Sequence, residues 1–119
     1  MTQMTGTQLI DNERKRQVEV EGWTPEHDDQ HGVEILLLAA LCYRDAEGEG
    51  SIQPTLWPWD SGWWKPKSRQ RNLERAGALY QAAADTAARA KEFDRRDEIR
   101  GHVASCAILL DSVLATESN

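Results

Sequence analysis

The sequence has little of what marks several common classes of protein. Its 119 residues include only two cysteines, Cys42 and Cys106, and both lie in apolar helical patterns. We therefore predict two buried free thiols rather than a disulfide or a metal pair. No signal peptide is visible, and the longest apolar run, Ile35 to Tyr43, is far shorter than the roughly 20 residues that cross a bilayer. These absences predict a cytoplasmic protein that does not enter the membrane.

Two signatures of chemistry are also missing. The chain has no glycine-rich loop to cradle a phosphate, and Ser61 lacks the flanking glycine of a nucleophile elbow. Nucleophilic catalysis is therefore not expected, and binding is favoured over turnover. The formal net charge of −6 argues against general nucleic-acid binding, which depends on Lys and Arg.

Charge is distributed unevenly along the chain. From Gln17 to Tyr43 there is no Lys or Arg, although carboxylates are frequent there. From Lys65 to Arg75 the sign reverses, with Glu74 as the single acid. We expect the two stretches either to complement each other across the fold or to face ligands of opposite sign.

The most distinctive stretch, Ile52 to Lys67, holds four of the five tryptophans. Its prolines and Gly62 are incompatible with a helix. Each indole buries a large apolar area and needs a partner for its N–H group. We therefore expect an irregular segment, held on the helices by its rings, that either walls a pocket or seals a core.

The rest of the chain has helical patterns. They predict a mainly α, single-domain fold over residues 1–119, a bundle of about four helices with the Trp- and Pro-rich segment packed on it. The expected elements are a loose tail over 1–6, helices over 7–21 and 33–45, a long helix from the cap Ser68 to about Phe93, and a last helix over 94–116 capped by Asp94. The apolar helix 33–45 is expected to be central. The alanines of the long helix predict close approach to a neighbouring helix.

The last helix carries a short heptad seam, whose members alternate steps of four and three. They are Ile99, Val103, Cys106, Leu110 and Val113. The seam either closes the bundle within one chain or pairs with a second copy in a homo-oligomer.

A second concentration of polar chemistry lies just before the apolar helix. Thr24-Pro25 has the form of a helix start, and the turn that follows packs two imidazoles and three carboxylates into residues 26–31. Upstream, Glu13, Gln17 and Glu21 form a polar row that is either solvated or turned inward. Together with the tryptophans, these groups predict a site.

The leading interpretation is non-catalytic binding of a small, flat, anionic ligand. Indoles would stack on a base, and cations at a helix start would meet phosphate. The predicted ligand-binding residues are Arg16, Trp23, His27, Asp28, Asp29, His31, Trp57, Trp59, Trp63, Trp64, Lys65, Lys67 and Arg71. This interpretation requires no cofactor.

An alternative interpretation uses the same turn as a metal site. His27, Asp28, His31 and Glu34 offer nitrogen and oxygen ligands to a divalent ion such as manganese or magnesium. The protein would then be a metal-dependent nucleotide phosphohydrolase or pyrophosphohydrolase. The simpler structural explanation is a turn whose carboxylates cap helix ends and bind arginine.

These motifs resemble a family of short proteins of bacteriophages and prophages, over residues 13 to about 80. The resemblance is carried by Glu13 to Gln17, Glu21 to His31, Trp57-Pro58-Trp59, Trp63 to Pro66, Arg71-Asn72-Leu73 and Ala76 to Leu79. It implies action in the host cytoplasm, on host metabolism or defence, either by holding a signalling nucleotide or by inhibiting a host protein through an exposed Trp surface.

The order of motifs is also similar to the RyR-type module. That module has an arginine, a Gly-Trp pair, a proline-aromatic segment and a basic helix start, as in Arg16, Gly22-Trp23, Pro58-Trp59 and 67–71 here. This similarity implies a nucleotide-like ligand.

Overall fold

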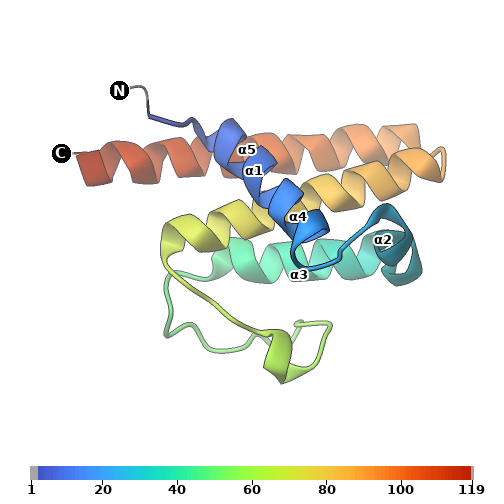
Figure 1. Cartoon of the computed structure of the whole chain (residues 1–119), viewed down its shortest axis with the longest axis horizontal. Coiled ribbons are helices and arrows are strands. Elements are labelled where there is room, and N and C mark those ends of the chain that lie inside the picture. Colours follow the sequence, from blue (N-terminus) through green and yellow to red (C-terminus); the bar gives the residue numbers. More distant parts are fainter. Residues whose placement is uncertain (1–2, 119) are drawn as a thin grey trace.

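The computed structural model describes residues 3–118, which form five α-helices and one short 3-10 helix (Figure 1). The α-helices are α1 (Gly6–Glu19), α2 (Pro25–His31), α3 (Val33–Asp45), α4 (Arg69–Arg89) and α5 (Phe93–Ser118), and the 3-10 helix is η1 (Ser61–Trp63). The prediction of a mainly α bundle is confirmed. The count exceeds four because residues 26–31, predicted as a turn, belong to the additional helix α2.

Local signals explain where several helices begin. The Thr24 hydroxyl accepts a hydrogen bond from the His27 N–H at 3.3 Å, and Pro25 occupies the first turn of α2. Ser68 caps α4 in the same way, through the Arg71 N–H at 3.2 Å. Both caps were predicted, and α3 has the predicted bounds.

The central helix is α4 rather than the predicted α3. It contacts α1, α2, α3 and α5, and 13 of its 21 residues are buried. Its many alanines are the reason, because small side chains let neighbouring helices approach from several directions. At Gly77 the approach is close, since an added Cβ would lie 2.4 Å from Ile10 Cδ1 on α1. Figure 1 shows α5 beside α4, α3 along its other side and α1 crossing over the pair.

The predicted loose tail is wrong at its last residue. Gly6 opens α1 and is buried, with its N–H donating to Asp111 Oδ1 on α5 at 2.7 Å. An added Cβ at Gly6 would lie 2.3 Å from the carbonyl oxygen of Ala107. Thr5 starts the helix through a capping box with Gln8. Met1 and Thr2, also in the predicted tail, lie outside the described residues.

The boundary between the last two helices also differs from the prediction. α4 ends at Arg89, and α5 begins at Phe93, so Asp94 lies inside its first turn rather than at its cap. The turn between them holds Lys91 at a φ of 63°, a left-handed conformation. A pattern of alanines does not mark this stop, because alanine favours continuation of a helix.

The heptad seam of α5 closes the bundle within the chain. Ile99, Cys106 and Leu110 are buried in the core, and Val103 and Val113 pack against it. Burial raises the pKa of the Cys106 thiol to about 11 and also raises the pKa of Cys42. Both cysteines are free and buried, as predicted.

Within the described residues, α5 is long and apolar enough to cross a membrane by length and composition. An 18-residue window of Phe93–Glu117 has a mean hydropathy of 1.3, and 22% of that window is buried. Continuous apolar runs do not reveal this helix, because polar residues interrupt it. Length and composition are a weak indication on their own, and Asp111, which binds Gly6, lies on this helix.

Candidate ligand-binding cleft

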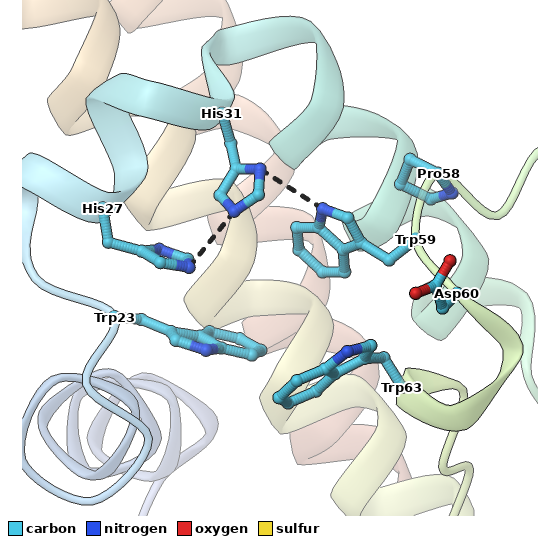
Figure 2. Close-up of a pocket in the computed structure, with 7 residues that line it drawn as sticks. All are labelled: Trp23, His27, His31, Pro58, Trp59, Asp60 and Trp63. Carbon is cyan, nitrogen blue, oxygen red and sulfur yellow. Dashed lines mark hydrogen bonds between the residues drawn. The ribbon is translucent and has the colours of Figure 1, made fainter.

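A cleft of about 390 Å³ opens between α2 and the segment that joins α3 to α4 (Figure 2). We call it the Trp-His cleft. It is lined by Trp23, His27, His31, Pro58, Trp59, Asp60 and Trp63. Three indoles and two imidazoles therefore surround a space of the size that small-molecule ligands occupy. Five of these seven residues were predicted to bind ligand.

One wall of the cleft is formed by the turn after α1 and by helix α2. The first helix was predicted to end at Glu21 but ends at Glu19, and Gly22, at a φ of 76°, lies in the turn that follows. The Trp23 N–H in this turn donates to the Gln17 carbonyl at 2.9 Å. His27 and His31 are four residues apart on α2 and so share one face. The Trp23 indole stacks on the His27 ring, with centroids 5.9 Å apart and planes within 1°.

The other wall belongs to residues 52–67, the Trp-rich segment. The indoles of this segment fix it in place. Trp57 is 7% exposed, and its N–H donates to the Asp60 carbonyl at 3.1 Å. The Trp64 N–H donates to the Ser51 carbonyl, also at 3.1 Å. Both rings contact Tyr43 on α3. Trp57 and Trp64 thus pack in or against the core, and the segment both seals a core and walls a pocket.

Side chains of α3 and α4 hold the end of the Trp-rich segment by hydrogen bonds to the segment's backbone. Arg75 donates to the Lys65 carbonyl at 2.7 Å, and the Lys65 N–H donates to the Tyr43 hydroxyl at 3.2 Å. The buried Asn72 side chain bonds both the N–H and the carbonyl of Lys67. These contacts position Trp63, which is 53% exposed, at the edge of the cleft.

A directional chain of hydrogen bonds crosses the cleft (Figure 2). The Trp59 indole N–H, which can only donate, lies 3.4 Å from His31 Nδ1. His31 therefore carries its proton on Nε2, which faces His27 Nε2 at 3.2 Å. His27 Nδ1 in turn faces Asp28 Oδ1 at 3.4 Å. The contacts at 3.4 Å are long, but each group has one consistent role as donor or acceptor along the chain.

Asp28 anchors this chain to the first helix. It is fully buried, and its Oδ2 accepts from Arg14 at 2.5 Å, while Arg14 also donates to the Trp23 carbonyl at 3.3 Å. Burial lowers the pKa of His31 below its ordinary value, and the neighbouring His27 lowers it further against the opposing charge of Asp28. The lowered pKa agrees with a neutral His31.

Beside the cleft, Glu13 and Gln17 of the predicted polar row turn inward, whereas Glu21 lies beyond the end of α1 and is exposed. Glu13 is 2% exposed and binds Arg16 in a bidentate pair at 2.8 and 2.9 Å, and Arg71 at 3.0 Å. Burial alone would raise the pKa of Glu13, but hydrogen bonds and charge from the two arginines outweigh burial and lower it. Arg16 also binds Glu21, and Arg71 binds Glu74. Arg16 and Arg71, both predicted to bind ligand, are thus paired with carboxylates of the chain.

Two other predicted residues lie away from the cleft. Asp29 binds Arg89 on α4 at 2.8 Å, and Glu34 binds Arg95 on α5. These pairs line a separate hollow of about 490 Å³, where each arginine faces a carboxylate. Lys67 is exposed at the start of α4.

The structure does not assemble the alternative metal set. His27, Asp28 and His31 lie together, but Glu34 is turned to Arg95. Within residues 3–118, no group of three or more His, Cys, Asp or Glu side chains is arranged to hold a metal ion.

The acidic stretch 17–43 and the basic stretch 65–75 do not pair with each other across the fold, which was one of the two expectations. Four acids of the first stretch pair with arginines that all lie outside residues 65–75. The pairs are Glu21–Arg16, Asp28–Arg14, Asp29–Arg89 and Glu34–Arg95. Arginine pairing depends on which helices meet, and helix packing is not visible in a count of charge along the chain.

Several residues at the cleft were missing from the predicted set. Pro58 and Asp60 line it, Arg14 supports it, and Gln17 and Arg75 line a smaller cavity beside it. For Gln17 the helical spacing of the polar row gave a usable signal. For Arg75 the sequence gave none, because its role depends on a contact with Lys65 across the fold.

Comparisons of the chain with protein-family models, with curated proteins and with solved structures found no match. The fold and the site define a small all-α protein with an aromatic cleft. The function has to be argued from that cleft.

Proposed function

We propose that the protein binds a small, planar, nucleotide-derived ligand in the Trp-His cleft and releases it unchanged. The observation that carries this proposal is the lining of the cleft, where three indoles and two imidazoles surround about 390 Å³. Flat aromatic walls favour flat ligands, because stacking of a base on an aromatic ring contributes about 1–3 kcal/mol. The volume falls in the range of small-molecule sites.

The charge beside the cleft supports an anionic part of the ligand. Lys65 Nζ lies 5.7 Å from the centroid of the Trp63 ring. A base stacked on Trp63 would bring its phosphate close to this ammonium group. Lys65 is exposed, so it supplies attraction and orientation rather than a desolvated ion pair.

A thermal-shift panel of mono-, di- and cyclic nucleotides tests the proposal, with product analysis of every nucleotide that binds. A ligand at about 100 times its Kd adds roughly 2.7 kcal/mol of stability. We expect Trp63→Ala to remove the shift, because Trp63 lines the cleft and is half exposed. Ile52→Ala is the matched control, since Ile52 is 90% exposed in the same segment and does not line the cleft.

Two results would count against binding in the cleft. One is the absence of any shift across the panel with folded protein. The other is a shift that survives Trp63→Ala. Conversion of a bound nucleotide to product would replace binding by catalysis.

The resemblance to phage proteins leads us to propose a biological setting for this binding. The protein would act in the host cytoplasm by holding a signalling nucleotide. A cyclic nucleotide that binds at least about tenfold more tightly than its linear monophosphate, a difference of about 1.4 kcal/mol, supports this role. Equal affinities would argue against it.

A protein-binding role is the second candidate, because the Trp-rich segment exposes large apolar side chains. Ile52 is 90% exposed and Leu56 57% exposed. Both side chains belong to the Trp-rich segment and lie four positions apart in the sequence. Charged substitutions at these two positions would abolish binding of a host protein and leave nucleotide binding intact, whereas unchanged capture of the host protein would exclude this surface.

A further inference from the structure

A smaller cavity of about 50 Å³ lies beside the Trp-His cleft, between α1, α4 and the Trp-rich segment. We call it the polar cavity. Trp23 and Trp63 line both spaces, so these two indoles form the boundary between them. The polar cavity also includes Gln17 from α1 and Arg75 from α4 in its lining. Its volume is sufficient for one small polar group.

Gln17 and Arg75 each have one buried side-chain atom with no hydrogen-bond partner among the described residues. The atoms are Gln17 Oε1, an acceptor, and Arg75 Nε, a donor. Gln17 is 1% exposed. Nearly all buried polar side-chain atoms in proteins have a partner, because an unpartnered one carries its full cost of desolvation. An acceptor and a donor left open in the same cavity therefore call for a complementary group.

Both side chains belong to segments fixed by other contacts. Arg75 donates through Nη1 to the Lys65 carbonyl at 2.7 Å, and its guanidinium lies 5.6 Å from the centroid of the Tyr43 ring. Gln17 belongs to the turn that its own carbonyl makes with the Trp23 N–H. A ligand that bonds Arg75 thus meets a guanidinium that is already oriented, and Gln17 extends from a fixed backbone; both lower the entropic cost of binding.

We propose that the polar cavity takes the lactam edge of the ligand's base, that is, an adjacent N–H and C=O on a planar ring. The N–H would donate to Gln17 Oε1, and the C=O would accept from Arg75 Nε. A carboxylate has no donor for the glutamine oxygen, and an ammonium group has no acceptor for the arginine. This inference rests on the proposed function, since the ring that bears the edge stacks at Trp23 and Trp63. It narrows the ligand to uracil-like or guanine-like nucleotides.

Calorimetric titration of two matched pairs of probes tests the inference on the wild-type chain. The pairs are uridine monophosphate with its 3-methyl derivative, and guanosine monophosphate with its 1-methyl derivative. Methylation removes the lactam N–H and leaves stacking and phosphate unchanged. We expect at least one parent nucleotide to bind about 10- to 100-fold more tightly than its methylated partner, as the loss of one buried hydrogen bond predicts.

The variant Gln17→Leu supplies the control at the protein side. It replaces the hydrogen-bond acceptor by an apolar side chain of similar size, so the variant is expected to fold. It should bind the parent and the methylated nucleotide with equal affinity. Gln17→Met is a second variant of the same design. Discrimination that persists in either folded variant would overturn the assignment of Gln17.

The remaining outcomes separate this inference from the proposed function. If the wild-type chain binds each parent and its methylated form equally, the lactam assignment is wrong and binding in the cleft stands. If a 6-carboxyuracil nucleotide binds more tightly than the uracil nucleotide, the cavity presents two donors and the assignment is overturned. If none of these nucleotides binds but another nucleotide of the thermal-shift panel does, the inference fails and the proposed function stands. If no nucleotide of that panel binds, both fail.

Discussion

Replacing Gly77 with alanine tests whether close packing holds α1 over α4. An ideal Cβ at Gly77 would lie 2.4 Å from Ile10 Cδ1 and 2.6 Å from Ile10 Cγ1. Carbon atoms in contact are normally about 3.5–4.0 Å apart, so α1 has to move outward by roughly 1 Å. The Ile10 side chain is 1% exposed in the core, and it has little room to rotate away instead.

Two effects of opposite sign determine the size of the change. Alanine in place of a glycine inside a helix gains about 1 kcal/mol, whereas overpacking a core costs about 1–3 kcal/mol. Gly101 on α5 is the matched control, because an added Cβ there meets no atom within 4 Å. We expect Gly101→Ala to raise the free energy of unfolding by about 0.5–1 kcal/mol. The free energy of unfolding of Gly77→Ala should be about 1–3 kcal/mol lower than that of Gly101→Ala.

Urea denaturation followed by circular dichroism measures both variants. Equal free energies of unfolding would refute the packing argument, since they would mean that α1 accommodates the extra methyl group without cost. Because α1 also carries Arg14 and Gln17, Gly77→Ala should weaken nucleotide binding as well. Gly101→Ala should leave binding unchanged.

Three further changes probe the site and the core. The pKa of His31 in the folded chain lies below its ordinary value of 6.5. The stability that the neutral imidazole contributes is therefore fully present above pH 6.5 and is lost as the pH falls through the folded pKa. Thermal unfolding should show this loss of stability at acid pH in the wild type and a smaller loss in His31→Asn. Glu13→Ala should lower the free energy of unfolding by about 2 kcal/mol in urea titrations, less than for a fully buried ion pair because both arginine partners are one-third exposed; a loss below about 0.5 kcal/mol would show that water replaces the carboxylate. Cys106 should react with a thiol reagent only on unfolding, because burial raises its pKa to about 11, and rapid labelling of the folded chain would contradict its place in the core.

The helix boundaries that depend on local chemistry could be predicted from the sequence. Thr24, Pro25 and Ser68 act at fixed offsets from the groups they cap, so their patterns identify helix starts without knowledge of the fold. The burial of Glu13 and Gln17 was one of two outcomes left open for the polar row. Their spacing predicted a shared face, but only the position of α4 decides that this face is buried.

The division of the tryptophans could not be predicted. Trp57 and Trp59 are two residues apart, yet one is in the core and the other lines the cleft. Both indoles have the same apolar area, and what separates them is the direction in which an irregular backbone turns. The same reason hid Arg75, whose contact with Lys65 forms only when the segment returns to α4.

The hydrogen bond between Gly6 and Asp111 joins residues 105 positions apart. The first turn of α1 therefore reaches its final position only after α5 has been made, because Asp111 lies on that helix. Contacts of such long sequence separation form late in folding, since the chain between them has to be ordered first. Helix α1 also brings Arg14 and Gln17 to the Trp-His cleft and the polar cavity. A chain truncated before α5 would thus lack the hydrogen bond that fixes the first turn of the helix that carries Arg14 and Gln17.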